Sequence, residues 1–427
     1  MIPIIRTDFS HHIADLHQTN QKTDDPQILA TLSQIRHDII AKGDAALIGY
    51  TQKFDRIDPK TFSLSVSDEE REAAYHQVPT EFIVAIKRAA TNIETFHKAQ
   101  RPKDWEKTSS TGITYGLRYT PIPKVGLYVP GGKAVYPSSI LMTAIPAQLA
   151  GVEECILVTP PGPDGTLAPA ILVTADILGI KSIYKVGGAQ AIFALATGTA
   201  TLPKVDKIVG PGNIYVTMAK QMVYGQVDID KPAGPSEVLV YIQDPAYAAF
   251  AAADLLCQLE HDPLAVAIAI SENETTLQAI QEEITRQLPL LKRQEILAAS
   301  LKNTALFLSP DLQTSYTLIN KVAAEHLVIM TDHPKDILTH VKHAGSVFLG
   351  THTPVTLGDY MAGPNHVLPT GGTARFASPL GVMDFMKYHS YLHYPEKELL
   401  ACQDELKILT EIEGLDAHFA AVEIRLK

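Results

Sequence analysis

The chain has 427 residues, which is too long for one compact core and predicts two or more domains. Its hydrophobic content of 46% and charged content of 19% are typical of a globular protein, while a net charge of −11, no basic cluster and a single Trp disfavour nucleic-acid binding. Short apolar runs and an N-terminus broken by early charges predict neither a membrane span nor a signal peptide, so we expect a cytoplasmic protein.

The first part of the chain is predicted to be helical. Residues 1–21 are expected to form a short helical arm, and residues 28–50 carry Ile and Leu at helical spacing. Ser67–Glu70 has the pattern of a capping box, in which a hydroxyl and a carboxylate three residues apart open a helix. The apolar stripe from Phe82 to Phe96 predicts another helix, and His97 at its end is interpreted as a surface residue.

The next part alternates strands, Gly/Pro loops and helices. The pattern predicts four buried strands, each followed by such a turn, at residues 125–129, 155–158, 182–186 and 207–209. This repetition is typical of a parallel α/β unit, whose ligands bind at the carboxyl ends of the strands. A nucleotide is a natural ligand there, although Gly210–Tyr215 has only the first two glycines of a GxGxxG fingerprint, so the pattern leaves nucleotide binding open.

A second α/β unit follows a Pro/Gly-rich hinge at Asp230–Glu237. Its strands are predicted at residues 238–242, 265–270, 305–308, 326–330 and 346–349, and a helical tail is expected after Pro379. The fold class is therefore α/β, with two incomplete Rossmann-like parallel α/β domains and small helical terminal segments. We expect an arm at 1–21, a first domain at 22–127 and 238–379, a second domain at 128–237, and a tail domain at 380–427.

Acids, imidazoles and amides gather in four places that could supply chemistry. Gln258 and His261 are three residues apart, which on a helix places them on one face. Together with Asp359 and His418 they would give the nitrogen and oxygen ligands that suit zinc and similar divalent ions. Spacing alone does not decide, because two other histidine pairs are equally well spaced, at 389/393 and at 340/343.

Two further groups have functional and structural interpretations. Glu325 and His326 precede a strand, where neighbouring side chains point different ways and can take separate acid/base roles. Cys257 adjoins Gln258 and could act as a nucleophile, but a packed apolar residue is the favoured interpretation. Neither a disulfide framework nor a CxxC zinc site is expected from three scattered cysteines.

The chain resembles the histidinol dehydrogenase family in six segments that occur in the same order and spacing. These segments are Leu127–Ala134, Val205–Asn213, Ala233–Glu237, Gln258–His261, Ala324–His326 and Asn365–Gly372. The resemblance covers nearly the whole chain from about residue 28. It implies oxidation of L-histidinol to L-histidine through an aldehyde-level intermediate, with zinc and two successive NAD molecules.

The resemblance also implies roles for individual residues. Zinc ligands would be Gln258, His261, Asp359 and His418, and the catalytic groups would be His326 as general base and Glu325 as activator of water. Substrate would contact the zinc ligands together with Ser236, His326 and Glu413, and NAD would lie against Tyr128, Gln190 and Asn213. The family forms an intertwined homodimer with shared active sites, which implies that Glu413 and His418 come from the other chain.

Some positions depart from the family pattern, and some alternatives stay open. Lys231 stands where an apolar residue is common, Asp262 where Gly is common, Pro364 where Thr is usual, and Ser378–Gly381 differs from the usual Ser-Gly-Leu-Ser. The metal could equally be manganese or cobalt. The alternatives are a zinc- and NAD-dependent dehydrogenase of another amino or sulfonated alcohol, and an inactive metal- or nucleotide-binding relative.

Overall fold

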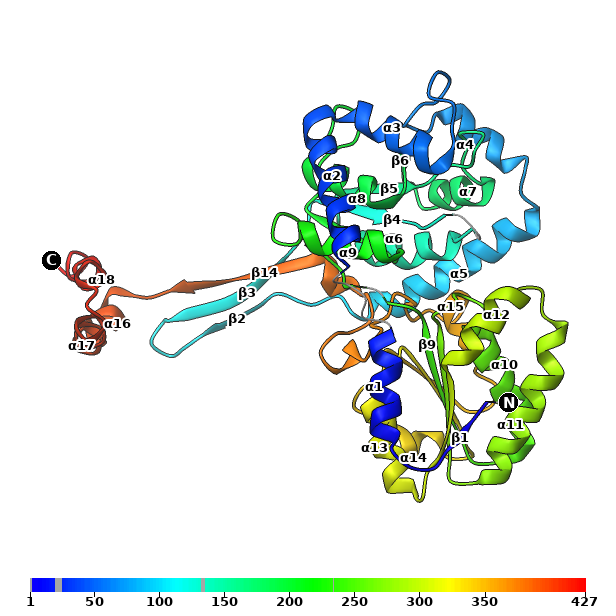
Figure 1. Ribbon diagram of the computed structural model, residues 1–427. Helices are drawn as coiled ribbons and strands as arrows, with labels where there is room; N and C mark the ends of the chain where they lie inside the picture. The colour runs from blue at the N-terminus through cyan, green and yellow to red at the C-terminus, as the bar shows by residue number, and fades with distance from the viewer. Residues whose placement is uncertain (1, 20–24, 132–134, 233) are drawn as a thin grey trace.

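Two parallel sheets and a long antiparallel arm make up the computed structural model, which describes residues 2–19, 25–131, 135–232 and 234–427 (Figure 1). Gly132 of the loop after the first predicted strand, Ala233 of the hinge, and residues 20–21 of the predicted arm lie outside these residues. The two sheets belong to separate bodies that stand one above the other in Figure 1, and the arm leaves from between them.

The upper body, here the five-stranded unit, has the strand order β6-β5-β4-β7-β8, and all its strands are parallel. Its strands are β4 (Lys124–Tyr128), β5 (Glu154–Thr159), β6 (Ser182–Lys185), β7 (Lys207–Val209) and β8 (Asp228–Ile229). Its helices are α2 (Pro26–Lys42), α3 (Asp44–Asp55), α4 (Asp68–Tyr75), α5 (Thr80–Lys98), α6 (Pro137–Ala150), α7 (Pro169–Ile177), α8 (Gly188–Thr197) and α9 (Ile214–Val223). They cover both faces of the sheet, as parallel strands require.

The lower body, the six-stranded unit, has the parallel order β1-β11-β10-β9-β12-β13. Its strands are β1 (Ile4–Ile5), β9 (Glu237–Ile242), β10 (Val266–Ser271), β11 (Thr304–Leu308), β12 (His326–Met330) and β13 (Ser346–Leu349). Its helices are α1 (Phe9–Thr19), α10 (Ala248–Leu259), α11 (Glu274–Gln287), α12 (Gln294–Ser300), α13 (Leu312–Val322), α14 (Pro334–Leu338) and α15 (Val355–Tyr360). Successive side chains of β9 enter the cores on opposite faces of the sheet.

The predicted assignment of residues 22–127 to the body that contains 238–379 is not what the packing shows. Helices α2 to α5 bury their apolar stripes against the five-stranded sheet, for example through Leu32 of α2 and Ile93 of α5. An amphipathic stripe indicates that a helix is buried but not which sheet it covers. The surface interpretation of His97 was also wrong, since this side chain is fully buried and its Nδ1 bonds the side chain of Gln100.

The N-terminal arm and the C-terminal tail also differ from expectation. The arm of residues 1–21 contains strand β1 as well as a helix, and both belong to the six-stranded unit. After a short 3-10 helix at Val382–Phe385, the tail continues with a strand, β14 (Met386–His393), that pairs with β3 (Thr114–Pro121), which pairs in turn with β2 (Trp105–Thr108). Only beyond this arm do helices α16 (Glu396–Ala401), α17 (Gln403–Glu413) and α18 (Asp416–Glu423) follow, far from both bodies (Figure 1).

The connection between the units brings strand ends of the two sheets near each other; here the carboxyl edge and the amino edge of a sheet are the sides at which its parallel strands end and begin. Strand β8 ends at Ile229 and β9 begins at Glu237, so a short linker runs from the carboxyl edge of the five-stranded sheet to the amino edge of the six-stranded sheet. Seven extended residues span at most about 25 Å. The carboxyl edge of one sheet therefore lies near the amino edge of the other.

Candidate active site

Glu325 and His326 lie at the amino edge of the six-stranded sheet, where β12 begins between β9 and β13. Both side chains are buried. Backbone atoms of Glu237 hold them: its N–H donates to Glu325 Oε2 at 2.8 Å, and its carbonyl accepts from His326 Nδ1 at 3.1 Å. Because a carbonyl only accepts, Nδ1 carries a proton, and Nε2 is left as the proton-accepting nitrogen of the neutral ring.

The Nε2 of His326 is buried and has no hydrogen-bond partner among the described residues. It lies 3.7 Å from Asp359 Oδ1, which is too long for a hydrogen bond but close enough for charge interaction. Burial favours the neutral ring, yet the negative charges of Glu325 and Asp359 outweigh burial and raise the pKa of His326 to about 10. At neutral pH this imidazole is therefore protonated in the metal-free chain.

Gln258 reaches the same cluster from the last turn of α10. Its Nε2 lies 3.4 Å from Glu325 Oε2, and because a carboxylate accepts only, the amide Oε1 remains as an acceptor. His261 lies beyond the end of the helix, and its N–H donates to the carbonyl of Gln258. The prediction that the two residues share one helix face was therefore wrong. Asp262 closes the next turn by accepting from the N–H of Leu264.

Asp359 lies near the end of α15 and interacts electrostatically with three histidines. Burial alone would raise the pKa of this carboxyl, but His326, His366 and His261 outweigh burial and lower it. His366 donates from Nδ1 to the carbonyl of Asp359 at 3.0 Å. The Gln258 amide, the Glu325 and Asp359 carboxylates and the His326 imidazole thus lie close together at this edge.

The carboxyl edge of the five-stranded sheet is the natural place for a nucleotide. The strand order reverses between β4 and β7, and ligands of open α/β sheets bind at such a switch point. Tyr128 ends β4, and its hydroxyl accepts from Gly188 N–H at the start of α8. Gly210 follows β7 with φ of +118°, and a side chain there would meet the carbonyl of Tyr128.

The other two predicted cofactor residues lie on the helices that start at this edge. Gln190 is buried in the first turn of α8. Asn213 is the exposed N-cap of α9, and its side chain accepts from the N–H of Val216. Exposed helix N-termini next to glycine turns favour phosphate.

Comparisons with known proteins give the family. A family model described as histidinol dehydrogenase matches residues 18–426. The histidinol dehydrogenase of Clostridium acetobutylicum is 48% identical over 408 residues, covering 95% of this chain and 94% of that protein. The crystal structure of a histidinol dehydrogenase from Elizabethkingia anophelis matches with a TM-score of 0.93 at 38% identity, covering 100% of this chain and 98% of that chain.

The chain belongs to the histidinol dehydrogenase family. It is an oxidoreductase of histidine biosynthesis that oxidises histidinol to histidine. The expected α/β fold of the family is also confirmed. No helix in the described ranges is long and apolar enough to cross a membrane.

The structure brings most of the residues expected for a histidinol dehydrogenase to the facing sheet edges. Gln258, Glu325, His326 and Asp359 are linked by the contacts above, and Ser236 lies in the linker directly before Glu237. Glu413 and His418 are not brought there. They are exposed on α17 and α18, at the far end of the arm (Figure 1).

The competing candidates do not form sites. His389 and His393 lie on the exposed strand β14, and His340 stacks on Tyr316. Within the described ranges no group of three or more His, Cys, Asp or Glu side chains is placed to hold a metal. The Cys257 thiol contacts Thr356 at 3.4 Å, and burial raises its pKa, which supports the packing interpretation.

Three residues at the site were not assigned a role from sequence. Glu237 orients both Glu325 and His326 through its backbone, and a backbone contact leaves no signal in residue type. Asp254, one helical turn before Gln258 on α10, accepts from the N–H of Val355, the first residue of α15. His366 stood in a recognised segment, and only its contact with Asp359 reveals its position.

Proposed function

We propose that the chain oxidises L-histidinol in two successive NAD-dependent steps, at the place where the amino edge of the six-stranded sheet faces the carboxyl edge of the five-stranded sheet. The observation that carries this proposal is the buried cluster of Glu325, His326 and Asp359 next to a nucleotide-type sheet edge. NAD would lie against Tyr128, Gln190 and Asn213. The substrate would occupy the gap between the two edges, in contact with Ser236.

We also propose that zinc is held by Gln258, His261 and Asp359 together with His418 of the partner subunit. This donor set suits zinc, and the available Oε1 of Gln258 and the ionised carboxyl of Asp359 support it. When bound, the ion would orient the amino alcohol and acidify its hydroxyl. Manganese and cobalt accept the same donors.

His326 would remove the alcohol proton through Nε2 while a hydride leaves the carbinol carbon for NAD. The bond from Nδ1 to the Glu237 carbonyl keeps Nε2 as the basic atom. A pKa of about 10 is too high for a base at neutral pH, but a cation beside Asp359 offsets the negative charge that raises it.

Glu325 would act in the second half of the reaction. Its Oε2 accepts from Glu237 N–H and faces the Gln258 amide, which leaves Oε1 for a water molecule. A carboxylate in that position can take a proton from water as the water attacks the aldehyde-level carbonyl. The resulting hydrate has a hydroxyl that His326 can deprotonate in the second hydride transfer.

The tail supports a homodimer with shared sites. Helices α16, α17 and α18 bury no residue within the chain, and large apolar side chains on them are exposed, including Leu400, Leu409 and Ile412. Such a surface favours burial against another chain. Packing against a partner would carry Glu413 and His418 to that partner's site. We place this dimer in the cytoplasm.

The test is NADH formation from L-histidinol, measured before and after chelation and in the variants His326→Ala and Glu325→Gln. We expect about two NADH per histidinol, loss of turnover on chelation, and recovery with zinc. Glu325→Gln should retain the first oxidation and slow the second. Turnover that survives complete metal removal would refute the zinc proposal, and NADH from another amino alcohol but not from histidinol would refute the substrate.

A further inference from the structure

The two units are joined by two passages of chain that lie side by side. Residues 230–236, the linker, lead from the five-stranded to the six-stranded unit. Residues 361–380, the return segment, lead back, and Val367 and Leu380 pack in the core of the five-stranded unit. A bond between the Leu380 N–H and the Val367 carbonyl closes residues 367–380 into a loop.

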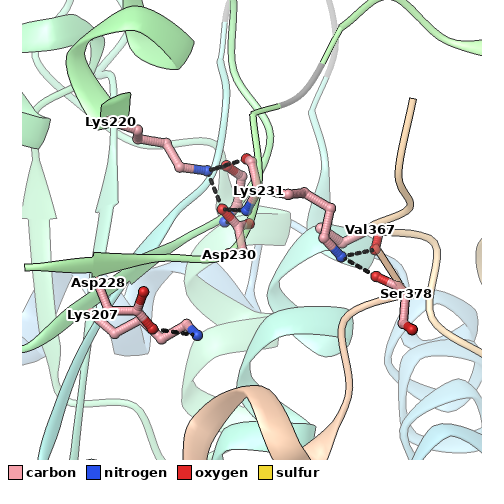
Figure 2. Close-up of polar contacts among 8 residues, drawn as sticks. Lys207, Lys220, Asp228, Asp230, Lys231, Val367 and Ser378 are labelled. Carbon is pink, nitrogen blue, oxygen red and sulfur yellow. Dashed lines mark hydrogen bonds and ion pairs between the residues drawn. The ribbon is translucent and has the colours of Figure 1, made fainter. Parts of the chain in front are cut away.

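A buried ion pair fixes the start of the linker to the proposed cofactor edge (Figure 2). The ammonium of Lys220 on α9 contacts Asp230 and donates to the carbonyls of Gly210 and Lys231 at 3.0 and 3.3 Å. Asp230 accepts in turn from the N–H groups of Gly210 and Lys231. Both charges are therefore fully hydrogen-bonded, as a buried pair requires. These bonds hold the turn after β7 against the first two residues of the linker.

Lys231 extends this network to the return segment (Figure 2). Its ammonium donates to the Ser378 carbonyl at 2.6 Å and to the Val367 carbonyl at 3.4 Å, so it holds both ends of the 367–380 loop. The residue is 7% exposed and forms no ion pair with any described carboxylate. Burying an ammonium on neutral acceptors is costly, and an apolar residue would serve mere packing as well.

The same two passages are tied again at the catalytic end. Gly234 N–H donates to Thr370 Oγ1 at 2.7 Å, and Gly371 N–H donates to Glu237 Oε1 at 2.9 Å. Glu237 is the residue whose backbone holds Glu325 and His326. A continuous series of contacts thus runs from Gly210 to the catalytic pair.

We propose that Lys231 is a positioning residue for hydride transfer. By bonding the linker to the return segment, it fixes the cofactor edge of one unit relative to Glu325 and His326 of the other. The proposal rests on NAD binding at that edge. Lys231 and the Ser378–Gly381 stretch, two of the departures from the family pattern, meet in this one contact.

The expected kinetic signature follows from where each ligand would bind. The proposed cofactor contacts lie in the five-stranded unit, and the substrate contacts supplied by the body of the chain lie in the six-stranded unit and at Ser236 directly before it. The Lys231 side chain bonds to neither set, so its removal should leave both binding constants nearly unchanged. Hydride transfer depends on both units, because donor and acceptor carbons must approach to about 3–3.5 Å. Loosening the tie should lower kcat by about tenfold while both KM values stay within about twofold, because an ångström of misplacement can cost more than that.

The experiment compares Lys231→Met with Lys207→Met. Lys207 is another buried lysine, on β7, but its partner is Asp228 on the adjacent strand β8, so its removal takes no bond from the linker (Figure 2). We expect the kcat loss in Lys231→Met alone, together with faster hydrogen exchange at the amides of Gly234, Gly371 and Leu380. Lys231→Gln keeps a neutral hydrogen-bond donor, so its kcat should lie between those of the wild type and Lys231→Met. This variant also tests the proposal if Lys231→Met does not fold.

The outcomes separate this inference from the proposed function. If Lys231→Met changes only the melting temperature, as Lys207→Met should, the positioning role is refuted. If kcat and both KM values change together, binding rather than alignment is affected, and the proposal also fails. Wild-type enzyme that forms no NADH from histidinol would refute the proposed function. The hydrogen-exchange measurement would still test whether Lys231 holds the linker against the return segment.

Discussion

Mixing two inactive variants tests whether the tail completes a neighbour's site. His418→Ala removes the proposed fourth ligand on α18, and His326→Ala removes the base at the start of β12. Within one chain, α18 lies far from the six-stranded unit, to which β12 belongs (Figure 1). In a dimer with exchanged tails, each site would combine His326 of one chain with His418 of the other. A mixed dimer would then contain one intact site and one site that lacks both groups.

The expected recovery follows from counting sites. Half of the sites in a mixed dimer are intact, so isolated mixed dimers should recover roughly half of the wild-type activity. The unfractionated mixture, in which random pairing makes about half of the dimers mixed, should recover roughly a quarter. The two variants are co-expressed with different affinity tags, mixed dimers are isolated by tandem purification, and NADH formation is assayed with added zinc. A control pairs His326→Ala with Glu325→Ala, which lie in the same body and cannot complement. Inactive mixed dimers that are folded and zinc-loaded would refute the exchange of tails.

Three further predictions concern single positions. Gly210→Ala should weaken NAD binding more than tenfold and destabilise the protein by about 1–3 kcal/mol, because φ at Gly210 is +118° and the new methyl group would meet the Tyr128 carbonyl. The control is Gly49→Ala, which has no neighbour within 4 Å and should stabilise the protein by about 0.5–1 kcal/mol. Calorimetry would measure both changes in stability. In zinc-free protein the pKa of His326 is raised to about 10, so the stabilising effect of its charge is complete below pH 6.5 and is lost as pH rises through about 10. NMR of the imidazole should therefore show a titration midpoint near 10, and Asp359→Asn should lower this midpoint. A midpoint near 6.5 in the wild-type chain would contradict the prediction. Burial raises the pKa of Asp55 to about 6, so the stability that this carboxyl contributes is present below its ordinary pKa and is lost as pH rises through about 6. Urea unfolding at pH 8 should therefore show Asp55→Asn to be more stable than the wild type by about 1 kcal/mol, after allowance for solvent screening. No gain in stability would contradict the prediction.

Strands and turns could be predicted because their signals are local. Every predicted strand of both units is present, several with the same limits, and the capping box at Ser67 forms as expected. The glycine turn at Gly210 was correctly placed after a strand, because positive φ and close backbone approach leave few other residues possible.

Long-range packing could not be read in the same way. The side of the molecule that α2 covers, the burial of His97 and the pairing of β14 with β3 all depend on partners distant in sequence. The separation of His418 from the rest of the proposed site has the same origin. Its residue type is informative, but its separation from Asp359 depends on an arm whose strand was not predicted.

The position of His326 as the first residue of β12 limits how the enzyme can move. Its strand is hydrogen-bonded to β9 on one side and β13 on the other, and its ring is packed near Phe348. Displacing the backbone of His326 would disturb the pairing of its strand with both neighbours, so this backbone should be among the slowest to exchange with solvent. Opening and closing during turnover must therefore take place in the parts around it, and the rate of product escape should respond to solvent viscosity and to changes in the linker or the tail.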